Sequence, residues 1–551
     1  MADPFIQREV AFPQLNTAQI DRIAPFGRVR SAQPGEVLFD QGESGRGVFI
    51  LIEGSIEIVN PTCKGEVIVT VHNAGEFTGE VDVLSGRRSL VRGRARTACK
   101  LIEIAPDDLR RIIQTDAELS EIFLRAFLLR RTHLINHTTG DVLLVGSSHS
   151  ADTLRLKAFL TRNGHPHAYI DVDRDSGVQE LLDHFAIRLE DIPVLICRGR
   201  KVLRNPTNAQ AADCLGFNTP LLSDAIHDLV VVGAGPAGLA AAVYGASEGL
   251  DVVVLEGNAP GGQAGSSSRI ENYLGFPTGI SGQDLAGRAF IQAEKFGANV
   301  AIAQLATGLQ CGPKPFRIEC ADGTAVLGRT VIVATGAAYR KLPLPNLAQF
   351  EGVGVYYGCT QVEAQLCSGE EAVVVGGGNS AGQAAVFLSG RVKHVHMLVR
   401  SGGLAESMSR YLIRRIEESP TITLRTHTSI IAIEGNGRLE RMTWRNSRTG
   451  ATETREIHHL FSMTGANPNT SWLRGCLLLD DKQFIKTGAD LHADEIASVN
   501  WPLSRSPYLF EASWPGVFAV GDVRASSVKR VASAVGEGSV AVQLVHKVLA
   551  E

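Results

Sequence analysis

The spacing of apolar residues changes twice along the chain and divides it into three segments. Up to about residue 137, short alternating apolar runs such as 47–60 are separated by glycines, a pattern typical of a small β barrel or jelly roll. A stretch with helical periodicity, 108–134, closes this segment. Residues 138–222 then alternate strand-like and amphipathic helical runs, which predicts a small α/β unit.

The third segment contains two units in which an apolar strand runs through a glycine-rich turn into a helix, at 227–258 and 370–403. This order of elements is typical of nucleotide-binding domains. We therefore expect two Rossmann-type domains, the second (346–463) inserted into the first (225–345 and 464–551). The predicted fold class is a multidomain protein with a β jelly roll, a small α/β domain and two nucleotide-binding domains.

The composition is nearly balanced in charge, with 54 Lys and Arg against 58 Asp and Glu and a formal net charge of −4 over 551 residues. This balance does not favour a nucleic-acid binder, which normally presents a basic face. With no secretory-signal pattern and no long apolar run, we expect a cytoplasmic protein without a membrane span. Nine scattered cysteines without a CxxC pair indicate mostly reduced thiols and no paired-CxxC zinc site, and no metal site is predicted.

The first glycine turn carries a dinucleotide fingerprint. Gly233 allows a tight turn, Gly235 lets the backbone approach a pyrophosphate, and Gly238 lets the helix pack on the strand. The helix N-terminus presents free N–H groups and a positive dipole end to the phosphates. The next strand ends at Glu256, whose carboxylate can accept a hydrogen bond from a ribose hydroxyl. Because strand, helix and acid are all in place, we expect a bound nucleotide rather than a glycine turn without a ligand.

The second glycine turn has Gly376, Gly378 and Ala381 at the three fingerprint positions. The following strand ends at Arg400, where an NAD site would place an acidic residue. A cation at this position suits the 2′-phosphate of NADP. The alternative is a solvated charge at a strand end, and NADH stays open as a cofactor.

Three further motifs fit the same two sites. VIVATGA (331–337) is a strand that enters a turn of small residues and can pass close to a nucleotide. GVFAVGDV (516–523) places Asp522 after a strand, where its carboxylate can hold a ribityl hydroxyl. PGGQAGSSSRIENYLGFP (260–277) supplies a Gly-Gly turn followed by polar contacts.

Together these motifs resemble the low-molecular-weight thioredoxin reductase family over about 325 residues. The shared motifs are GAGPAG at 233–238, GGQ at 261–263, IENYLGFP at 270–277, ATG at 334–336, GGGNSA at 376–381, NPNT at 467–470 and GVFAVGDV at 516–523. The resemblance implies an FAD domain in two pieces, an inserted NADPH domain, a homodimer, and hydride flow from NADPH through FAD to a disulfide.

The resemblance also implies the residues that contact each cofactor. For FAD these are Gly233, Gly235, Pro236, Ala237, Gly238, Glu256, Gly262, Gln263, Asn272, Ala334, Thr335, Gly336, Gly521, Asp522, Val531 and Ala532. For NADPH they are Gly376, Gly378, Asn379, Ser380, Ala381, Arg400 and Arg410. Arg410 is included because the family's run of basic residues is reduced here to Arg400.

The chain departs from this family at the redox cysteines. The family's CxxC falls on Cys359-Thr360-Gln361-Val362, so valine stands in place of the second cysteine. A dithiol must offer one sulfur to the flavin and one to the substrate, and the ordinary cycle does not close with one. Cys359 is the candidate catalytic residue, and Cys367 could serve as its resolving partner in place of the missing cysteine. The alternative interpretation is that both cysteines are small apolar residues without redox function.

The second segment resembles a thioredoxin or glutaredoxin domain, with Ile192-Pro193 at that family's cis-proline position. Where the family carries CxxC, this chain has Ser150 and Thr153, which form no disulfide. We therefore expect a docking or structural module whose polar residues cap a helix. A pocket for a small-molecule thiol is the alternative.

The first segment resembles the cyclic-nucleotide-binding domains of the catabolite activator family, through 34–43, 49–58 and 77–80. That family uses a glutamate on the ribose and an arginine on the cyclic phosphate. Glu80 is present, but serine stands at the arginine's position. The candidate effector residues are Gly79, Glu80, Arg87, Arg88, Ser89 and Arg92. A cyclic nucleotide, a different nucleotide-like ligand and a purely structural barrel all remain open, and no helix-turn-helix follows the barrel.

Three functions are compatible with these features. The leading one is an FAD-dependent NAD(P)H oxidoreductase whose acceptor is a small molecule or a protein other than thioredoxin, with regulation by the N-terminal domain. The first alternative is a disulfide reductase that uses Cys359 with Cys367. The second is a flavin-based redox or ligand sensor that acts through partner binding. Retention of both nucleotide fingerprints favours the first, and loss of both CxxC motifs disfavours the disulfide reductase.

Overall fold

The computed structural model describes residues 8–44, 47–62, 65–79, 82–85, 87–137, 142–175, 182, 187–197, 201–218, 221, 224–312, 314–473, 475–499 and 501–551. The chain forms two compact units. The first unit comprises residues 1–146, 163–221 and 291–303, and the second comprises 147–162, 222–290 and 304–551. No helix within the described ranges is long and apolar enough to cross a bilayer.

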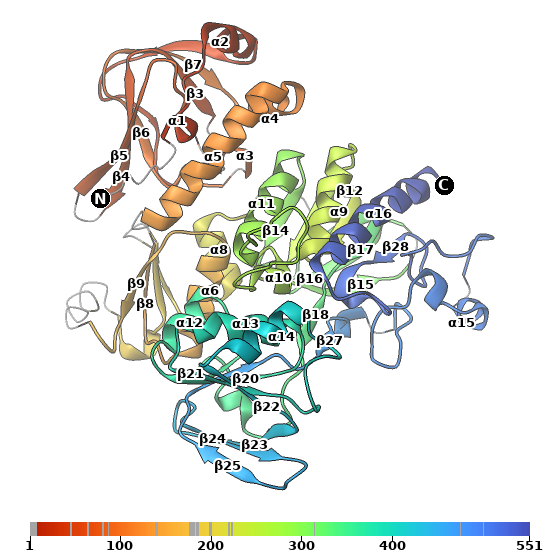
Figure 1. Ribbon diagram of the computed structural model, residues 1–551. Coiled ribbons are helices and arrows are strands. Elements are labelled where there is room, and N and C mark those ends of the chain that lie inside the picture. The colour runs from red at the N-terminus through yellow and green to blue at the C-terminus, as the bar shows by residue number, and fades with distance from the viewer. Residues whose placement is uncertain are drawn as a thin grey trace. The chain divides into compact units, whose positions relative to one another are not determined.

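The first unit begins with a β barrel made of two antiparallel sheets, drawn in red and orange in Figure 1. One sheet has the order β1 (Arg28–Ala32), β7 (Cys99–Ile104), β3 (Val48–Glu53), and the other β2 (Val37–Phe39), β6 (Arg92–Ala95), β4 (Ser55–Thr62), β5 (Gly65–Asn73). Alternating apolar residues on these strands, among them Phe49, Leu51 and Ile56, form one buried core. The predicted N-terminal β domain is confirmed.

Helices precede and follow the strands of the barrel, and one short helix lies between β5 and β6. They are α1 (Arg8–Ala11), α2 (Thr17–Ile23), α3 (Asp82–Ser85), α4 (Pro106–Thr115) and α5 (Ala117–His137). Phe123 and Phe127 of α5 pack edge-on against Phe77, which closes a second apolar core. The helical run expected at 108–134 is therefore two helices, because Asp116 is extended and ends α4.

The rest of the first unit contains a four-stranded sheet in the order β11 (Lys201–Arg204), β10 (Val194–Cys197), β8 (Val142–Gly146), β9 (Ala168–Asp171). Strands β8 and β9 are parallel, whereas β10 is antiparallel to both of its neighbours. The Ile192–Pro193 peptide bond that precedes β10 is cis, as the resemblance implied. Helix α8 (Asn208–Leu215) follows, and a helix expected at 176–187 lies mostly outside the described residues.

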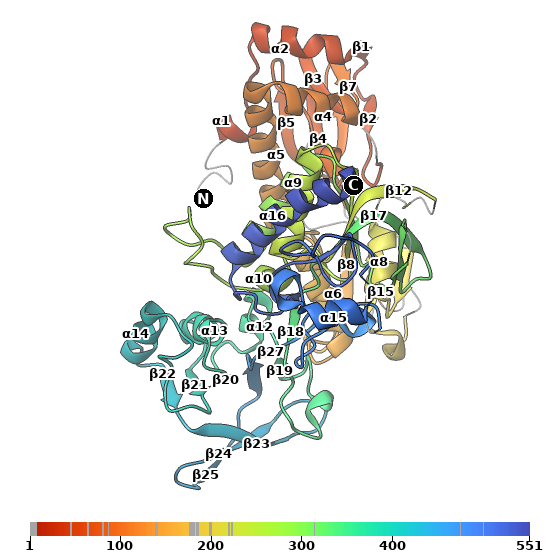
Figure 2. The same ribbon diagram turned by 90° about the vertical axis from the view of Figure 1, so that its right-hand side faces the viewer.

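The second unit contains α6 (Ala151–Arg162) and the two nucleotide-binding folds. In the first fold, β12 (Ile226–Val232) pairs in parallel with β13 (Val252–Glu256) and with β17 (Ala325–Val333), and β17 pairs with β28 (Val517–Ala519). Strands β16 (Phe316–Cys320) and β15 (Ala306–Gln310) extend this sheet in antiparallel fashion. Helices α9 (Pro236–Ser247) and α16 (Val531–Ala550) lie side by side in both ribbon views (Figures 1 and 2).

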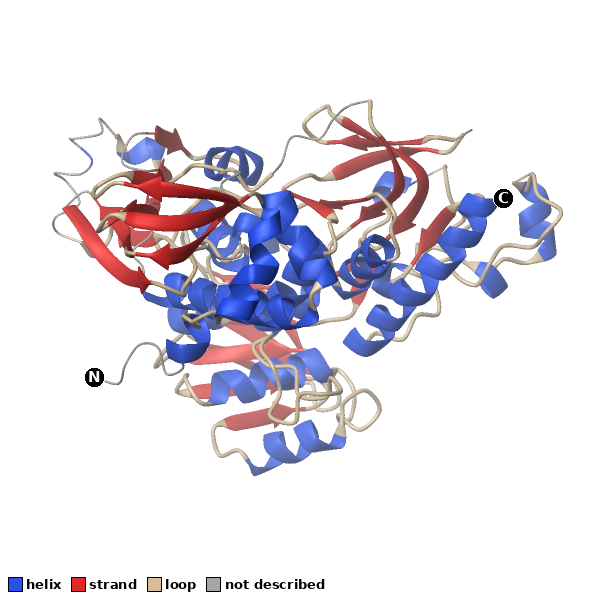
Figure 3. Cartoon of the chain, turned by 90° about the horizontal axis from the view of Figure 1, so that it is seen from above, coloured by secondary structure: helices blue, strands red, loops and turns tan. Residues whose placement is uncertain are grey.

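The second fold has a parallel sheet in the order β19 (Val355–Tyr356), β26 (His459–Ser462), β20 (Glu371–Val375), β21 (His394–Leu398), β22 (Ile422–Arg425). It carries α12 (Gln361–Leu366), α13 (Asn379–Ser389) and α14 (Arg410–Glu418). A separate antiparallel sheet follows, with β23 (Thr428–Glu434), β24 (Arg441–Asn446) and β25 (Thr452–Arg455). Strands β18 (Ala337–Tyr339) and β27 (Ala466–Pro468) pair where the chain passes between the two folds. Figure 3 shows the strands gathered in separate sheets.

Two features of the second unit were not expected from the sequence. Cys311 and Cys476 form a disulfide, although the sequence indicated mostly reduced thiols. The stretch 492–511, for which a lid and a dimer contact were both open interpretations, contains α15 (Ala493–Ser498) and is held in place by Arg505. This guanidinium lies 2.7 Å from the buried carboxylate of Glu511 and 2.6 Å from that of Glu551 at the end of α16.

Candidate functional site

The turn between β12 and α9 forms a cradle for a phosphate group. A Cβ added to Gly238 would lie 1.8 Å from the carbonyl oxygen of Gly233, and one added to Gly233 would lie 2.5 Å from that of Ala334. These two glycines are therefore required by packing. Around Gly235, the N-cap of α9, the nearest atom to such a Cβ is the Cα of Gly262 at 4.0 Å. Gly235 thus faces open space at a helix N-terminus, where a phosphate binds most readily.

Glu256, the last residue of β13, holds this turn together. Its carboxylate accepts N–H bonds from Ala234 at 2.8 Å, Asn258 at 2.9 Å and Ala259 at 3.2 Å. Burial raises the pKa of this carboxyl, and the three N–H bonds act in the opposite direction. A carboxylate has about four acceptor positions. One position therefore remains beside the contacts of the described residues, and its use for a ribose hydroxyl stays a prediction.

The Gly-Gly turn of the GGQ motif packs directly against the phosphate cradle. A Cβ on Gly262 would lie 3.1 Å from the Cα of Gly235. The amide of Gln263 donates to the carbonyl oxygen of Ala337 in β18. The predicted contacts of this motif therefore lie beside those of the first fingerprint.

The predicted turn after β17 lies on the same edge of the sheet. Ala334 is buried, and its N–H donates to the carbonyl oxygen of Val232 at the end of β12. Thr335 and Asn469 exchange two hydrogen bonds of 2.9 and 2.8 Å, and Gly336 has a positive φ of 62°. This arrangement fixes the ATG turn against the NPNT motif.

The second predicted FAD turn joins β28 to α16. Gly521, with φ of 73°, packs on Ala237 of α9, and its N–H donates to Glu537 at 2.6 Å. Burial raises the pKa of the neighbouring Asp522 carboxyl, whereas the ammonium of Lys529 acts to lower it. Lys529, which the sequence did not single out, donates to the carbonyl oxygen of Asp522 at 2.7 Å.

Three other predicted FAD residues complete this set. Val531 and Ala532 are the first two residues of α16, directly after this turn. Asn272 is exposed in the loop that follows the GGQ motif. The structure therefore places most of the predicted FAD residues at the carboxyl edge of one sheet and Asn272 in a surface loop.

The NADPH fingerprint repeats the geometry of the first turn. Gly376 has a φ of 141°, and an added Cβ would lie 2.4 Å from the carbonyl oxygen of Met463. Gly378, the N-cap of α13, has no atom within 4 Å of such a Cβ, so it faces open space. Ala381 is fully buried, and Asn379 accepts the N–H of Ser409 at 2.7 Å.

Arg400 and Arg410 are the two predicted cations of this site. Both side chains are exposed, and neither forms an ion pair with a described residue. Ser409, which Asn379 holds, is the N-cap of α14 and directly precedes Arg410. Ser380 hydrogen-bonds Tyr339, whose hydroxyl has a pKa raised by burial. The arginines are therefore available to an anionic group next to the second fingerprint.

Cys359 and Cys367 lie in one apolar cluster of the NADPH-binding fold. Cys359 is 5% exposed and Cys367 is fully buried, and no disulfide joins them. Burial raises the pKa of the Cys359 thiol well above its usual value and that of Cys367 to about 12. Cys367 donates its S–H to the carbonyl oxygen of Glu363 at 3.1 Å. These shifts disfavour the thiolate form of both sulfurs, which the thiol–disulfide cycle requires. The side chain of Val362 is outside the described residues.

Ser150 and Thr153 occupy the start of α6. The hydroxyl of Ser150 accepts the N–H of Thr153 at 3.3 Å, the contact expected of a helix cap. Thr153 is fully buried. The capping contact is as predicted, and the role of the segment as a docking or structural module stays a prediction.

The candidate effector residues of the barrel do not converge. Arg92 pairs with Asp40 at 2.8 Å and with Glu66 at 2.6 Å. Arg87 lies over the ring of Phe217, and Arg88 donates to the carbonyl oxygen of Cys214 at 3.2 Å. The Ser89 hydroxyl donates to the carbonyl oxygen of Val91, Gly79 has a φ of 100°, and Glu80 lies outside the described residues. The four described side chains therefore make protein contacts in different directions.

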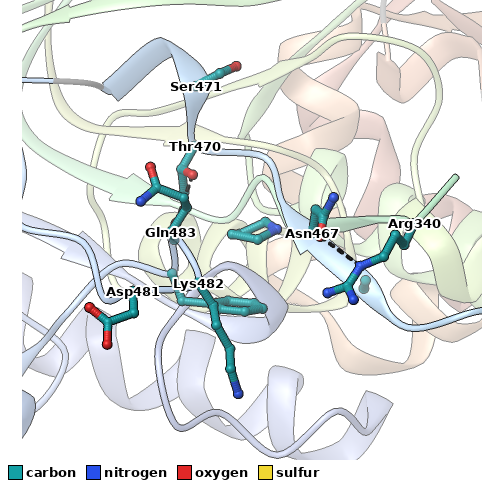
Figure 4. A pocket seen from close by; sticks show the side chains of 10 residues that line it. Arg340, Asn467, Thr470, Ser471, Asp481, Lys482 and Gln483 are labelled. Carbon is teal, nitrogen blue, oxygen red and sulfur yellow. Dashed lines mark hydrogen bonds between the residues drawn. The ribbon is translucent and has the colours of Figure 1, made fainter. Parts of the chain in front are cut away.

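A cavity of about 340 Å³ lies beside the NPNT motif (Figure 4). Arg340, which follows β18, donates to Asn467 at 3.3 Å on one side, and Asp481, Lys482 and Gln483 line the other. The sequence singled out only the NPNT part of this group, and Arg340 is separated from the other lining residues by more than a hundred positions. Its two cations and polar groups suit a small polar or anionic molecule.

The residues present fit FAD and a nicotinamide nucleotide. Gly235 and Gly378 each stand at the N-terminus of a helix with open space in front, whereas Gly233, Gly238 and Gly376 are needed where the chain is crowded. The carboxylate of Glu256 has one acceptor position left for a hydroxyl group beside its three N–H bonds. When bound, FAD supplies the two-electron chemistry, and the nicotinamide nucleotide supplies the hydride.

Comparison with known families gives two matches. Residues 227–538 match pyridine nucleotide-disulphide oxidoreductases, and residues 29–116 match the cyclic nucleotide-binding domain. The first match covers more than half of the chain. The chain belongs to the pyridine nucleotide-disulphide oxidoreductase family. Its predicted fold class is thereby confirmed, and it is an FAD- and NAD(P)H-dependent oxidoreductase of the thioredoxin reductase-like type.

Individual relatives align with the same part of the chain. NADPH-dependent thioredoxin reductase 3 of Arabidopsis thaliana is 31% identical over 361 residues, 62% of this chain and 64% of that protein. The alignment thus spans less than two thirds of the Arabidopsis protein. Thioredoxin reductase of Bacillus subtilis (strain 168) is 29% identical over 326 residues, 59% of this chain and 96% of that protein. The structure of Lactococcus lactis thioredoxin reductase (FR conformation) is 26% identical, with a TM-score of 0.52, and covers 59% of this chain and 99% of that chain.

Proposed function

We propose that this protein transfers hydride from NADPH to FAD and passes the electrons to an acceptor other than a thioredoxin disulfide. The observation that carries the proposal is the environment of Cys359. This sulfur stands alone at the family's CxxC, is buried in an apolar cluster, and has a raised pKa. A thiol in this state neither takes up electrons as a disulfide nor attacks one.

The retained parts of the site support the first half of this reaction. The cradle at Gly235 and the carboxylate of Glu256 bind and orient the FAD side, and the open N-terminus of α13 receives the nicotinamide nucleotide. Arg400 and Arg410 are exposed and form no ion pair with a described residue, and they favour NADPH over NADH because NADPH carries the additional 2′-phosphate. The cavity between Arg340 and Lys482 is a candidate binding place for a small acceptor.

A disulfide reductase that uses Cys359 with Cys367 is the second candidate. In its favour, both sulfurs lie in the same apolar cluster. Against it, Cys367 is fully buried and donates its S–H to Glu363 of the preceding helical turn.

Restoring the missing cysteine tests the proposal. Val362→Cys should create NADPH-dependent reduction of dithiobis-nitrobenzoate, at least tenfold above the wild type. Val362→Ser is the matched control and should behave as the wild type. Wild-type reduction of the disulfide reagent at the rate of Val362→Cys, lost in Cys367→Ser, would instead establish the second candidate.

The other parts of the proposal are the N-terminal domain and the assembly. The match of residues 29–116 supports a nucleotide-like effector that regulates the enzyme, and the occupied arginines argue against a cyclic phosphate held as in the catabolite activator family. We also propose a cytoplasmic homodimer, on the basis of the family resemblance. Addition of cyclic AMP or cyclic GMP should leave the melting temperature unchanged, and light scattering should give twice the mass of 59.0 kDa.

A further inference from the structure

Arg162, the last residue of α6, reaches the edge of the flavin cradle. Its Nη2–H group donates to the carbonyl oxygen of Gly262 at 3.1 Å. Its Nε atom is buried and has no hydrogen-bond partner among the described residues. A buried donor normally finds a partner. The guanidinium therefore has donor capacity that its protein contacts do not use.

The position of Gly262 shows what lies next to this guanidinium. Gly262 packs against Gly235, the residue that faces open space at the N-terminus of α9. Arg162 is thus attached to the same turn that forms one wall of the phosphate cradle. Burial lowers the pKa of the Arg162 guanidinium, whereas the carboxylates of Glu256 and Glu363 act to raise it.

The end of α6 is fixed in this place by a further contact. The carbonyl oxygen of Thr161 accepts the amide of Gln283, a residue of α11 (Gly282–Lys295), at 2.8 Å. At its other end, α6 is capped by Ser150. Helix α6 is therefore held at both ends, and its last side chain, that of Arg162, extends toward the flavin-binding fold.

We propose that Arg162 is a ligand of the FAD pyrophosphate and that the segment 147–162 is part of the flavin site. A guanidinium presents five N–H donors in a rigid fork, which matches two phosphate oxygens better than an ammonium does. The N-terminus of α9 supplies partial positive charge, and Arg162 adds a full charge at the rim of the cradle. A residue whose only role was to hydrogen-bond the Gly262 carbonyl oxygen would need a single donor and no charge, whereas Arg162 has further donors and a full charge. The inference rests on FAD binding by the proposed function.

The test measures nucleotide binding by the full-length apoprotein. FAD binding is followed by flavin fluorescence, and ADP, which carries the pyrophosphate but no flavin ring, is measured by competition. Arg162→Gln should weaken both FAD and ADP by about tenfold or more, as expected for a lost hydrogen bond to a charged group. Arg162→Lys should weaken both by a smaller factor, and Arg155→Gln on the same helix should bind as the wild type.

Two results would overturn the inference. One is unchanged FAD affinity in Arg162→Gln. The other is a loss of FAD affinity with unchanged ADP affinity, which would mean that Arg162 only supports the fold around the flavin ring. The melting temperature of each apoprotein shows whether a variant is folded, and Arg162→Lys provides the binding data if Arg162→Gln is not. If the wild type binds no FAD, the proposed function and the inference are both wrong. If the wild type binds FAD and the Arg162 variants do not show the expected weakening, only the inference is wrong.

Discussion

The backbone of Cys359 forms a parallel bridge with the backbone of Ser267. Ser267 follows α10 (Gly262–Gly265), the short helix of the GGQ turn, so this bridge joins the segment at the family's CxxC position to the loop beside the flavin cradle. A dithiol at 359–362 would therefore lie next to the flavin-binding loop. The chain retains this contact and carries valine at 362, where the family's motif has its second cysteine.

The two glycines of the first cradle should respond differently to the same substitution. Gly235→Ala should leave the apoprotein melting temperature within about 2 °C of the wild type, because the added Cβ meets open space, yet weaken FAD binding at least tenfold. Gly238→Ala should prevent stable folding, since its Cβ would lie 1.8 Å from a carbonyl oxygen. Thermal unfolding and flavin fluorescence measure both effects. Equal behaviour of the two variants would contradict the assigned roles.

Cys359 and Cys367 should resist alkylation in the native protein. Burial and the raised pKa of both thiols suppress the thiolate at pH 7.5. Mass spectrometry after a short treatment with iodoacetamide should find both unmodified, and both modified when the treatment is repeated in urea. Rapid labelling of Cys359 in the native state would show a reactive thiolate and favour the disulfide reductase.

Arg400 and Arg410 should determine the preference for NADPH. Replacing either by Gln should raise the KM for NADPH about tenfold through loss of a charge-assisted hydrogen bond and leave the KM for NADH unchanged. Arg414→Gln, an exposed change on the same helix as Arg410, is the control and should alter neither. An equal effect on both nucleotides would mean that these arginines do not contact the 2′-phosphate.

The barrel should lose stability as the pH falls. His72 is 2% exposed, and burial lowers its pKa from 6.5 to about 4. The folded barrel therefore favours the neutral imidazole, and stability present above pH 6.5 is lost between pH 6.5 and 4, by up to about 3 kcal/mol. Hydrogen exchange of β4 and β5 amides, corrected for intrinsic rates, should show this loss. His72→Gln should reduce the pH dependence, whereas the exposed His149→Gln should not.

Local sequence patterns were sufficient for the cofactor cradles. Gly233, Gly235 and Gly238 lie within one strand–turn–helix unit, and Glu256 ends the next strand, so their arrangement follows from rules that act over about thirty residues. The fold class could be predicted for the same reason. The placement of the missing CxxC at 359–362 rests on the spacing of the family motifs and stays a prediction.

Contacts between distant segments could not be predicted. Arg162 and Gly262 are a hundred positions apart, and helical periodicity does not show what the end of α6 touches. Arg88 was grouped with the effector residues by its place in the barrel, yet it contacts Cys214. The pairing of Cys311 with Cys476 spans 165 positions, and cysteine spacing alone does not determine a disulfide.

The most direct test of the central claim is anaerobic stopped-flow reduction of the purified flavoprotein by NADPH, followed by mixing with air or with dithiobis-nitrobenzoate. The account predicts rapid bleaching of the flavin, reoxidation in air, and no reoxidation by the disulfide reagent. Reoxidation by the disulfide reagent that disappears in Cys359→Ser would contradict it and show that the thiol route operates.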